Sequence, residues 1–390
     1  MTQPHASINV TRYVWAHGVA QLLLWSGFYY LLPALSAKIA IETGWPVLNI
    51  SITYTGAFLL WAIMAPVVGM LIDKGHGRKV MRIGAIVGVV LLLGLSMTSN
   101  ETVFSVLVVL LGACMAATLY DPCFSVMMLR LKSNGTNAIA TVTLIAGFAT
   151  LLTFPLVIGL SLIMGWQQIV LVFAVLAFIG MLILPSEVEA VASKAQTHNK
   201  LPLERGPVLI ALSFGLAMMG HAILLFLLPV ALVSDSGDAQ SGLLALAILG
   251  PAQIAGRTAW KYYGAAWSPR GCAILMFAFM CIPATLMLVA GTAQPIIYAA
   301  LIIQGACYGV HTILRPSLAQ RYLHPTHLGR GLGAIAMVGV LMMAVGPAVG
   351  GLVWTNAGLS GLMIAILVLN GLALVLSGIL QITPPKEVIV

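Results

Sequence analysis

Long apolar runs, separated by short polar stretches, make up almost the whole chain. A helix needs about 20 apolar residues to cross a hydrocarbon core of roughly 30 Å, and these runs reach that length without the alternating polarity of barrel strands. The first half holds runs over residues 12–36, 46–71, 79–99, 102–129, 138–163 and 166–184. The second half holds runs over residues 207–233, 241–260, 271–290, 295–320, 331–354 and 359–382. The pattern predicts an all-α integral membrane protein of about twelve transmembrane helices.

The composition agrees with a protein that lies in a bilayer. Hydrophobic residues make up 61% of the 390 residues, and the mean hydropathy is +1.05. A soluble protein of this size would expose far too much apolar surface to water. A polar stretch interrupts the apolar pattern near the middle of the chain. We therefore expect an N-terminal six-helix bundle over residues 1–185, a cytoplasmic linker over 186–206 and a C-terminal six-helix bundle over 207–390.

Short sequence echoes indicate that the two halves are related. Leu31-Leu32-Pro33 in the first run returns as Leu227-Leu228-Pro229 in the seventh. Asp121-Pro122 in the fourth run has its counterpart in Arg315-Pro316 in the tenth. Two pseudo-symmetric halves are what a transporter needs in order to rock one half against the other around a central site.

Basic residues lie almost entirely on one side of the predicted membrane. If the N-terminus is cytoplasmic, nearly every Lys and Arg falls at a cytoplasmic helix end, and Lys38 is the clear exception. This bias sets the orientation of a membrane protein, so we expect a multi-pass protein of the cell inner membrane with both termini in the cytoplasm. The same sidedness explains the net charge of +8 without a nucleic-acid partner. The first apolar run is too long for a cleaved signal peptide, so we expect it to remain as a helix.

The loop between the second and third runs carries the most specific motif. It combines Gly69, Asp73, Lys74, Gly77, Arg78 and Lys79. This loop resembles the signature between helices two and three of the major facilitator superfamily, and with the twelve runs the resemblance covers essentially the whole chain. It implies two six-helix bundles that work by alternating access.

The resemblance also implies a role for this loop. Gly69 would let helix two pack against helix eleven, whose start contains Gly329, Gly331 and Gly333. Asp73 would cap that helix through its unpaired amides and its dipole, and Arg78 would brace the contact. Together they would latch the cytoplasmic side shut. The alternative is an ordinary basic loop that only orients the chain.

Two opposite charges inside apolar runs are the first candidates for a functional site. Asp121 and Arg315 occupy matching places in the two halves, on helices four and ten, which line the central cavity in the family that the chain resembles. A charge in a membrane is costly unless it is paired or faces water, so we expect the two to meet. The pair would act either as a proton and substrate switch or as a structural strut.

Other polar residues within the runs complete the candidate site. Gln253 and Arg257 lie one helical turn apart, and this spacing resembles the acidic-x-x-x-Arg pair of the monocarboxylate and oxalate/formate-like branch, with Gln in place of the acid. Arg257 could instead anchor the inner surface. His221 is a candidate because imidazole changes charge near neutral pH, although a lone helical histidine also serves in packing. The remaining candidates are His17, Gln21, Gln304, Tyr308 and His311.

The function that we expect is secondary active transport. The sequence contains no catalytic constellation, no metal motif and no phosphate-binding loop, so we expect neither an enzyme nor a cofactor, and the energy would come from an ion gradient. The leading substrate is a small organic anion such as a carboxylate, coupled to protons, carried by a monomer in the lipid bilayer. The alternatives are proton-driven efflux of amphipathic drugs or metabolites, a transporter-like receptor, and a membrane enzyme.

Overall fold

The computed structural model describes residues 9–131, 135–185, 204–236, 246–264, 267–323 and 328–384. All regular elements within these ranges are helices. Ten of the described helices are long and apolar enough to cross a membrane. One of them, Gly331–Gln381, is 51 residues long and kinks at Gly358, where φ is 58°, so it accounts for two predicted helices. The predicted all-α membrane fold is confirmed, with a helix count close to twelve.

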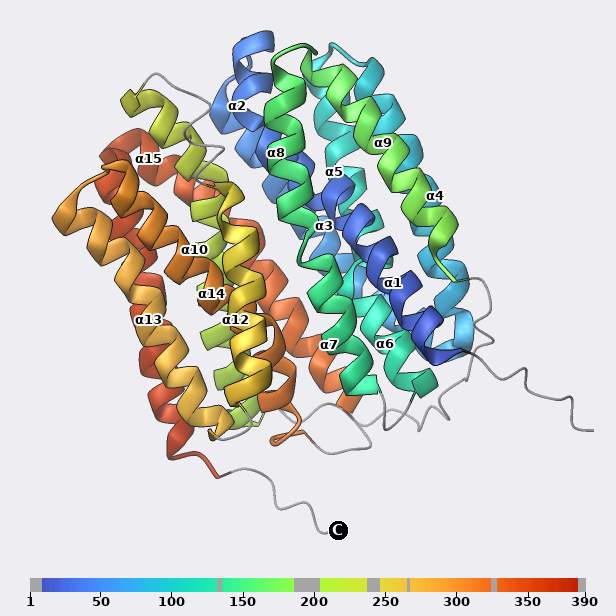
Figure 1. The fold of residues 1–390 in the computed structure, drawn as a ribbon, viewed down its shortest axis with the longest axis vertical. Coiled ribbons are helices and arrows are strands. Elements are labelled where there is room, and N and C mark those ends of the chain that lie inside the picture. Colours follow the sequence, from blue (N-terminus) through green and yellow to red (C-terminus); the bar gives the residue numbers. More distant parts are fainter. Residues whose placement is uncertain are drawn as a thin grey trace, which may run out of the picture.

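The helices form two sets that lie side by side, and each set comes from one half of the chain (Figure 1). The N-terminal set contains α1 (Val10–Trp25), η1 (Ser26–Tyr30), α2 (Leu31–Thr43), α3 (Val47–Leu71), η2 (Ile72–His76), α4 (Gly77–Met97), α5 (Glu101–Thr118), α6 (Tyr120–Leu131), α7 (Gly135–Ala146), α8 (Ala149–Ser161) and α9 (Trp166–Ile183). The C-terminal set contains α10 (Arg205–Ser236), α12 (Leu249–Tyr263), α13 (Pro269–Ala290), α14 (Gln294–Ala319) and α15 (Leu328–Gln381).

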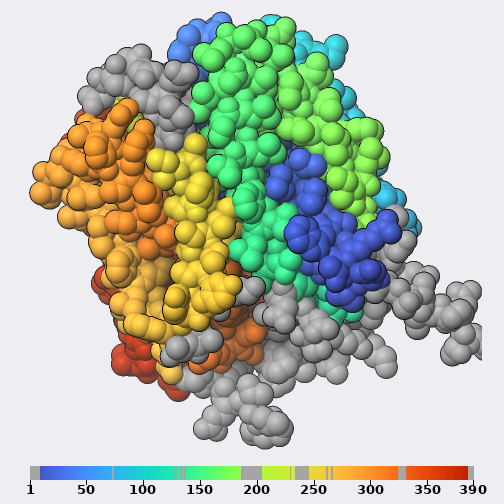
Figure 2. Space-filling view, in the orientation of Figure 1, coloured from blue at the N-terminus to red at the C-terminus, as the bar shows by residue number. Residues whose placement is uncertain are grey.

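The two sets touch along their long sides, as the blue-to-green and yellow-to-red surfaces of Figure 2 show. Helix α3 packs against α15 across this boundary, and smaller contacts join α2 to α10 and α8 to α12. Helix α1 begins and α15 ends at the lower end of Figure 1, which is the end that the charge bias assigns to the cytoplasm. We call it the lower end and its opposite the upper end.

Three of the predicted helices are interrupted in the middle. The first contains a π-helical turn over Ser26–Tyr30 and continues to Thr43, beyond the predicted end at residue 36. The fourth breaks at Leu119, where ψ is −153°, and the fifth breaks after Ala146. Hydropathy did not reveal these breaks, because the residues on both sides are apolar. Each break frees backbone groups that need new partners.

Lys38, the exception to the charge bias, is neutralised at the upper end. Its Nζ lies 2.6 Å from Oε1 of Glu42 and donates a hydrogen bond to the Ser161 carbonyl. The other carboxylate oxygen of Glu42 accepts from the Trp166 amide at 3.0 Å. The pair therefore closes the end of α8 and the start of α9, which explains why a lysine is tolerated on this side.

Gly69 of the loop motif has no close neighbour in this conformation. A methyl group added at Gly69 or at Gly333 would meet open space, so the expectation that Gly69 packs closely against helix eleven is wrong for this structure. Contact between α3 and α15 is found instead near the upper end, where Gly351 lies beside Leu48 and Ser51.

The loop itself turns sharply at Gly75, whose φ of 87° favours glycine. Gly77 packs closely against Val126 of α6, and the side chains of Lys74, Arg78 and Lys79 are exposed. The side chain of Asp73, which we expected to cap helix eleven, lies outside the described part of the structure.

Candidate functional site

An aromatic cluster surrounds the π-helical turn of the N-terminal set. Trp25 is central to it, with ring centroids 5.0 Å from Tyr29, 5.9 Å from Tyr30 and 4.6 Å from Tyr120. The π-helical turn at Ser26–Tyr30 widens the helix at this point, and such turns recur at functional sites. It lets the consecutive rings of Tyr29 and Tyr30 both contact Trp25.

The aromatic cluster continues onto α3 and reaches the other set. The rings of Phe58 and Trp61 flank Tyr29 at 5.7 and 6.2 Å. Phe58 also contacts Phe226 of α10, with centroids 5.8 Å apart. The Tyr29 hydroxyl points to Sδ of Met343 on α15 at 3.7 Å. The cluster therefore faces the boundary between the two sets.

One face of α14 presents polar side chains in the C-terminal set. Gln304, Tyr308, His311 and Arg315 are spaced by four, three and four residues, so they share a face. The contacts show that this face turns toward α10. His221 stacks on Tyr308 with centroids 3.5 Å apart and an angle of 13° between the rings.

Two further contacts fix the same face of α14. Nε2 of His311 lies 3.1 Å from the Phe214 carbonyl, and the His311 ring is parallel to Tyr308 within 9°. The Arg315 guanidinium lies 3.5 Å from Sδ of Met218. Three of the predicted residues, His221, Tyr308 and His311, are thus brought together in one stack.

Arg257 is a buried cation at the boundary between the sets. Only 3% of this residue is exposed. Its Nη1 donates to the Thr143 carbonyl at 2.6 Å, and its Nη2 points to Oε1 of Gln253 at 3.4 Å. The hydroxyl of Tyr120 lies close to the same guanidinium. All these partners are neutral, and no carboxylate of the described residues forms an ion pair with Arg257.

The break in the fifth predicted helix explains the contact with Thr143. Helix α7 ends at Ala146, and the Thr143 carbonyl already accepts from the Gly147 amide. A carbonyl in the last turn of a helix attracts cations through the helix dipole. Arg257 of the C-terminal set therefore caps a helix of the N-terminal set. The sequence did not predict this cap. It predicted that Arg257 acts with Gln253 in the site or anchors the inner surface.

Asp121 and Arg315 meet across the two sets, as their charges led us to expect. Oδ1 of Asp121 lies 3.9 Å from Nη2 of Arg315, and the side chains are 35% and 22% exposed. The break at Leu119 places Asp121 in the first turn of α6, where the helix dipole favours a carboxylate. The pair is loose and partly accessible to solvent, unlike a tight buried strut.

His17 and Gln21 do not join this site. Both are buried on α1 and hydrogen-bond backbone carbonyls of the N-terminal set, although Oε1 of Gln21 has no partner among the described residues. Nδ1 of His17 lies 3.0 Å from the Tyr13 carbonyl, and Nε2 of Gln21 donates to the Thr118 carbonyl at 2.7 Å. Thr118 is the last residue of α5, so Gln21 caps the break in the fourth predicted helix. The structure gives both residues local structural partners.

Sequence reasoning missed the aromatic residues of the site. Trp25, Tyr29, Tyr30 and Tyr120 were passed over, because aromatic side chains in apolar helices usually serve in packing. Two signals were present: the adjacent tyrosines at 29 and 30, and a tyrosine directly before the intramembrane Asp121. Both place a polar hydroxyl where a purely structural helix does not need one.

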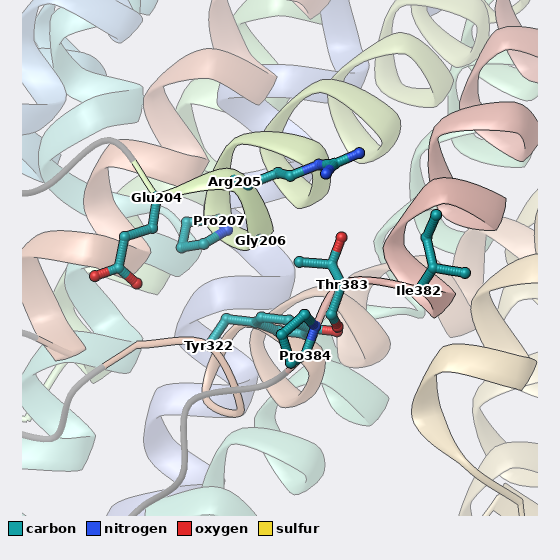
Figure 3. A pocket seen from close by; sticks show the side chains of 8 residues that line it. All are labelled: Glu204, Arg205, Gly206, Pro207, Tyr322, Ile382, Thr383 and Pro384. Atoms are coloured by element: carbon teal, nitrogen blue, oxygen red, sulfur yellow. The ribbon is translucent and has the colours of Figure 1, made fainter.

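A separate pocket of about 290 Å³ lies at the lower end of the C-terminal set (Figure 3). It is lined by Glu204, Arg205, Gly206, Pro207, Tyr322, Ile382, Thr383 and Pro384. The Tyr322 hydroxyl donates to the carbonyls of Leu380 and Thr383 at its wall. None of the predicted site residues lines this pocket.

The chain matches the family model described as Major Facilitator Superfamily over residues 18–257 and 210–389. Two crystal structures of the nucleoside transporter NupG, one of a mutant, are similar with 14% identity and TM-scores of 0.70 and 0.73. The alignments cover 96% of this chain and 98% and 99% of NupG. The human organic anion transporter MFSD10 is similar at 16% identity and a TM-score of 0.74, with 96% of this chain and all of MFSD10 covered. These similarities show the fold.

No curated protein matches the chain. The resemblance to the monocarboxylate and oxalate/formate-like branch therefore stays a prediction. The family match covers more than half of the chain, in agreement with the predicted resemblance and with the twelve-helix pattern. The chain belongs to the Major Facilitator Superfamily and is a membrane transporter rather than an enzyme.

Proposed function

We propose that this transporter is a secondary active carrier of a small organic anion, a carboxylate, which it moves by alternating access. The observation that carries this proposal is Arg257, a buried guanidinium whose described partners are all neutral. A charge in apolar surroundings costs several kcal/mol unless an opposite charge compensates it. A substrate carboxylate would supply that charge and match the planar guanidinium with two parallel hydrogen bonds.

The groups around Arg257 suit an anion with an apolar body. Nε of Arg257 is buried without an acceptor among the described residues, so the guanidinium keeps a donor that a substrate oxygen can use. The faces of the aromatic cluster offer apolar contact for the rest of the substrate.

We propose that the loose ion pair of Asp121 and Arg315 couples transport to protons. Protonation of Asp121 would remove its attraction for Arg315 and leave a second cation available to the substrate. Both side chains are partly exposed, so protons can reach the carboxylate without unfolding of the site. A proton gradient would then favour entry of the anion together with a proton, as in a symporter; an antiporter would instead exchange the anion for a proton moving the other way.

The conformation is the one that we expect after opening toward the cytoplasm. Tyr54 and Phe226 join the two sets toward the upper end with ring centroids 4.8 Å apart, whereas Gly69 and Gly333 meet no neighbour. The excess of Lys and Arg supports a cytoplasmic lower end.

Efflux of an amphipathic compound is the second candidate, and the aromatic cluster favours it. Aromatic faces bind planar apolar molecules whatever their charge. NupG is a nucleoside transporter and MFSD10 is an organic anion transporter, so this fold serves both neutral and anionic substrates. The two candidates differ in whether a negative charge on the substrate is required.

A thermal-shift experiment with the purified protein tests the proposal. Ligands that bind only the folded state raise its melting temperature. We expect 3-phenylpropionate to stabilise the protein and its neutral amide to have no such effect. Arg257→Gln should abolish the difference. Arg270→Gln is the matched control, because Arg270 also donates to backbone carbonyls, those of Gln381 and Thr383, outside the site. Equal stabilisation by acid and amide would favour the efflux candidate.

A further inference from the structure

Gln304 is the least satisfied buried polar side chain of the site. The residue is 0% exposed, and neither its amide nitrogen nor its amide oxygen has a hydrogen-bond partner among the described residues. A buried polar group without a partner costs about 1–3 kcal/mol, and native structures seldom leave one unexplained. Its position is therefore hard to justify by packing alone.

A second unpaired group lies next to the Tyr308 ring of α14. His221 is 1% exposed, and its Nδ1 has no partner in the described part of the chain. The His221 ring stacks on Tyr308, and Gln304 lies one helical turn before Tyr308 on the same face. Two buried, unsatisfied polar side chains from α10 and α14 thus border one position.

The unpaired groups of Gln304 and His221 call for an uncharged partner. A glutamine amide offers both a donor and an acceptor, and Nδ1 of histidine offers either, according to its tautomer. A hydroxyl, a carbonyl or an amide can satisfy such a set. A second carboxylate would lack a cation there, since Arg315 lies eleven residues further along α14, beside Asp121.

The packing of α12 on α14 shows how far this position lies from Arg257. Gly305 lies against Leu249 and Ala252, Gly309 against Gln253, and Gly256 against Ala306. Arg257, which follows Gly256, is then level with a residue between about 307 and 313 of α14. At 1.5 Å per residue, its backbone and that of Gln304 are about 4 to 13 Å apart along the axis.

We propose that Gln304 and His221 form a second, uncharged subsite, which hydrogen-bonds a hydroxyl, carbonyl or amide group at the far end of the anion that Arg257 holds. The inference rests on the proposed function and deepens it. The substrate is then an acid whose carboxylate and second polar group are separated by about the length of an aromatic ring. The aromatic cluster covers the apolar part between them.

The test compares pairs of acids that differ by one hydroxyl. For the wild-type protein in proteoliposomes, we expect 3-(4-hydroxyphenyl)propionate to compete for transport at least about tenfold better than 3-phenylpropionate, as a hydrogen bond in a desolvated site requires. Lactate should gain nothing comparable over propionate, because its hydroxyl lies beside the carboxylate and cannot reach Gln304.

Variants separate a subsite from a merely structural amide. Gln304→Leu and His221→Phe should each reduce the tenfold ratio to near one while leaving the phenyl acid bound. Asn370→Leu is the matched control: Asn370 is a buried amide with an unpaired oxygen, and it donates to Met280. Its loss should leave the ratio intact.

The possible failures are distinct. If the phenyl acid binds but the wild-type ratio is near one, or if Gln304→Leu keeps the ratio, the subsite is refuted and the anion proposal stands. If neither acid binds, the proposed function itself fails. Should Gln304→Leu not fold, Gln304→Met and the His221→Phe variant give the same comparison.

Discussion

The two helix sets share a fold but differ in how they use their polar side chains. In the N-terminal set, Gln21 and His17 are bound to backbone carbonyls of their own set, and aromatic rings face the boundary. In the C-terminal set, Arg257, Gln304 and His221 keep unpaired groups there. Pseudo-symmetry therefore governs the scaffold and not the chemistry: the N-terminal set supplies the aromatic cluster and the carboxylate of Asp121, and the C-terminal set supplies the cations Arg257 and Arg315.

The same difference appears where the sequence looked most symmetric. Asp121-Pro122 begins the helix α6, because a proline is readily accommodated in a first turn. Arg315-Pro316 lies inside α14, with Arg315 just before its last turn. The two dipeptides match in position along the chain, yet one starts a helix after a break and the other does not. Their side chains nevertheless meet at 3.9 Å.

The largest expected effect is the loss of the cation in the C-terminal set. Arg257→Gln should lower kcat/KM for carboxylate uptake by more than about 100-fold, since removing a buried charge partner costs about 2–5 kcal/mol. Arg257→Lys should be intermediate, because it keeps the charge without the planar fork. Uptake into proteoliposomes is the measurement. Normal uptake by Arg257→Gln would place the anion elsewhere.

The ion pair between the sets should give the next largest effect. Breaking a fully buried pair costs about 3–5 kcal/mol, but this one is partly exposed, so we expect about 1–3 kcal/mol for Asp121→Asn or Arg315→Gln. The double variant should recover stability but not proton-coupled uptake. Denaturation in detergent and uptake driven by a pH gradient measure the two properties. Strictly additive losses would mean that the pair contributes no coupling.

Substitutions in the aromatic cluster should act differently from those in the C-terminal set. Trp25→Ala removes apolar contact and should weaken the binding of acids and of neutral amides alike, by about tenfold. It should leave the acid-to-amide preference unchanged, whereas Arg257→Gln abolishes that preference. Competition assays with both ligands distinguish these outcomes. A change of preference in Trp25→Ala would contradict the division of roles between the two sets.

The smallest expected effect concerns the glycine of the loop motif. Because Gly69 faces open space, Gly69→Ala should change stability by less than about 0.5 kcal/mol. Gly112→Ala is the contrast, since a methyl group there would collide with the backbone of Ala57. If closure of the lower end needs close packing at Gly69, Gly69→Ala should still slow transport. Unchanged transport would mean that the loop serves only to orient the chain in the membrane.

Much of the fold could be predicted from hydropathy, since long apolar runs have few alternatives to spanning helices. The meeting of Asp121 and Arg315 was also predictable, because two opposite charges in matching runs need each other. The breaks at Leu119 and Gly147 were not, since hydropathy is the same on both sides, although Pro122 was a local signal for the first. The contact of Arg257 with Thr143 involves a backbone carbonyl, which no sequence pattern marks.

The central claim is that Arg257 holds the carboxylate of the substrate. A structure of the protein with 3-(4-bromophenyl)propionate, whose bromine can be located by anomalous diffraction, tests it most directly. We expect the carboxylate within hydrogen-bond distance of the Arg257 guanidinium and the bromine between the aromatic cluster and Gln304. A carboxylate bound elsewhere, with Arg257 still paired only to Thr143 and Gln253, would contradict the claim.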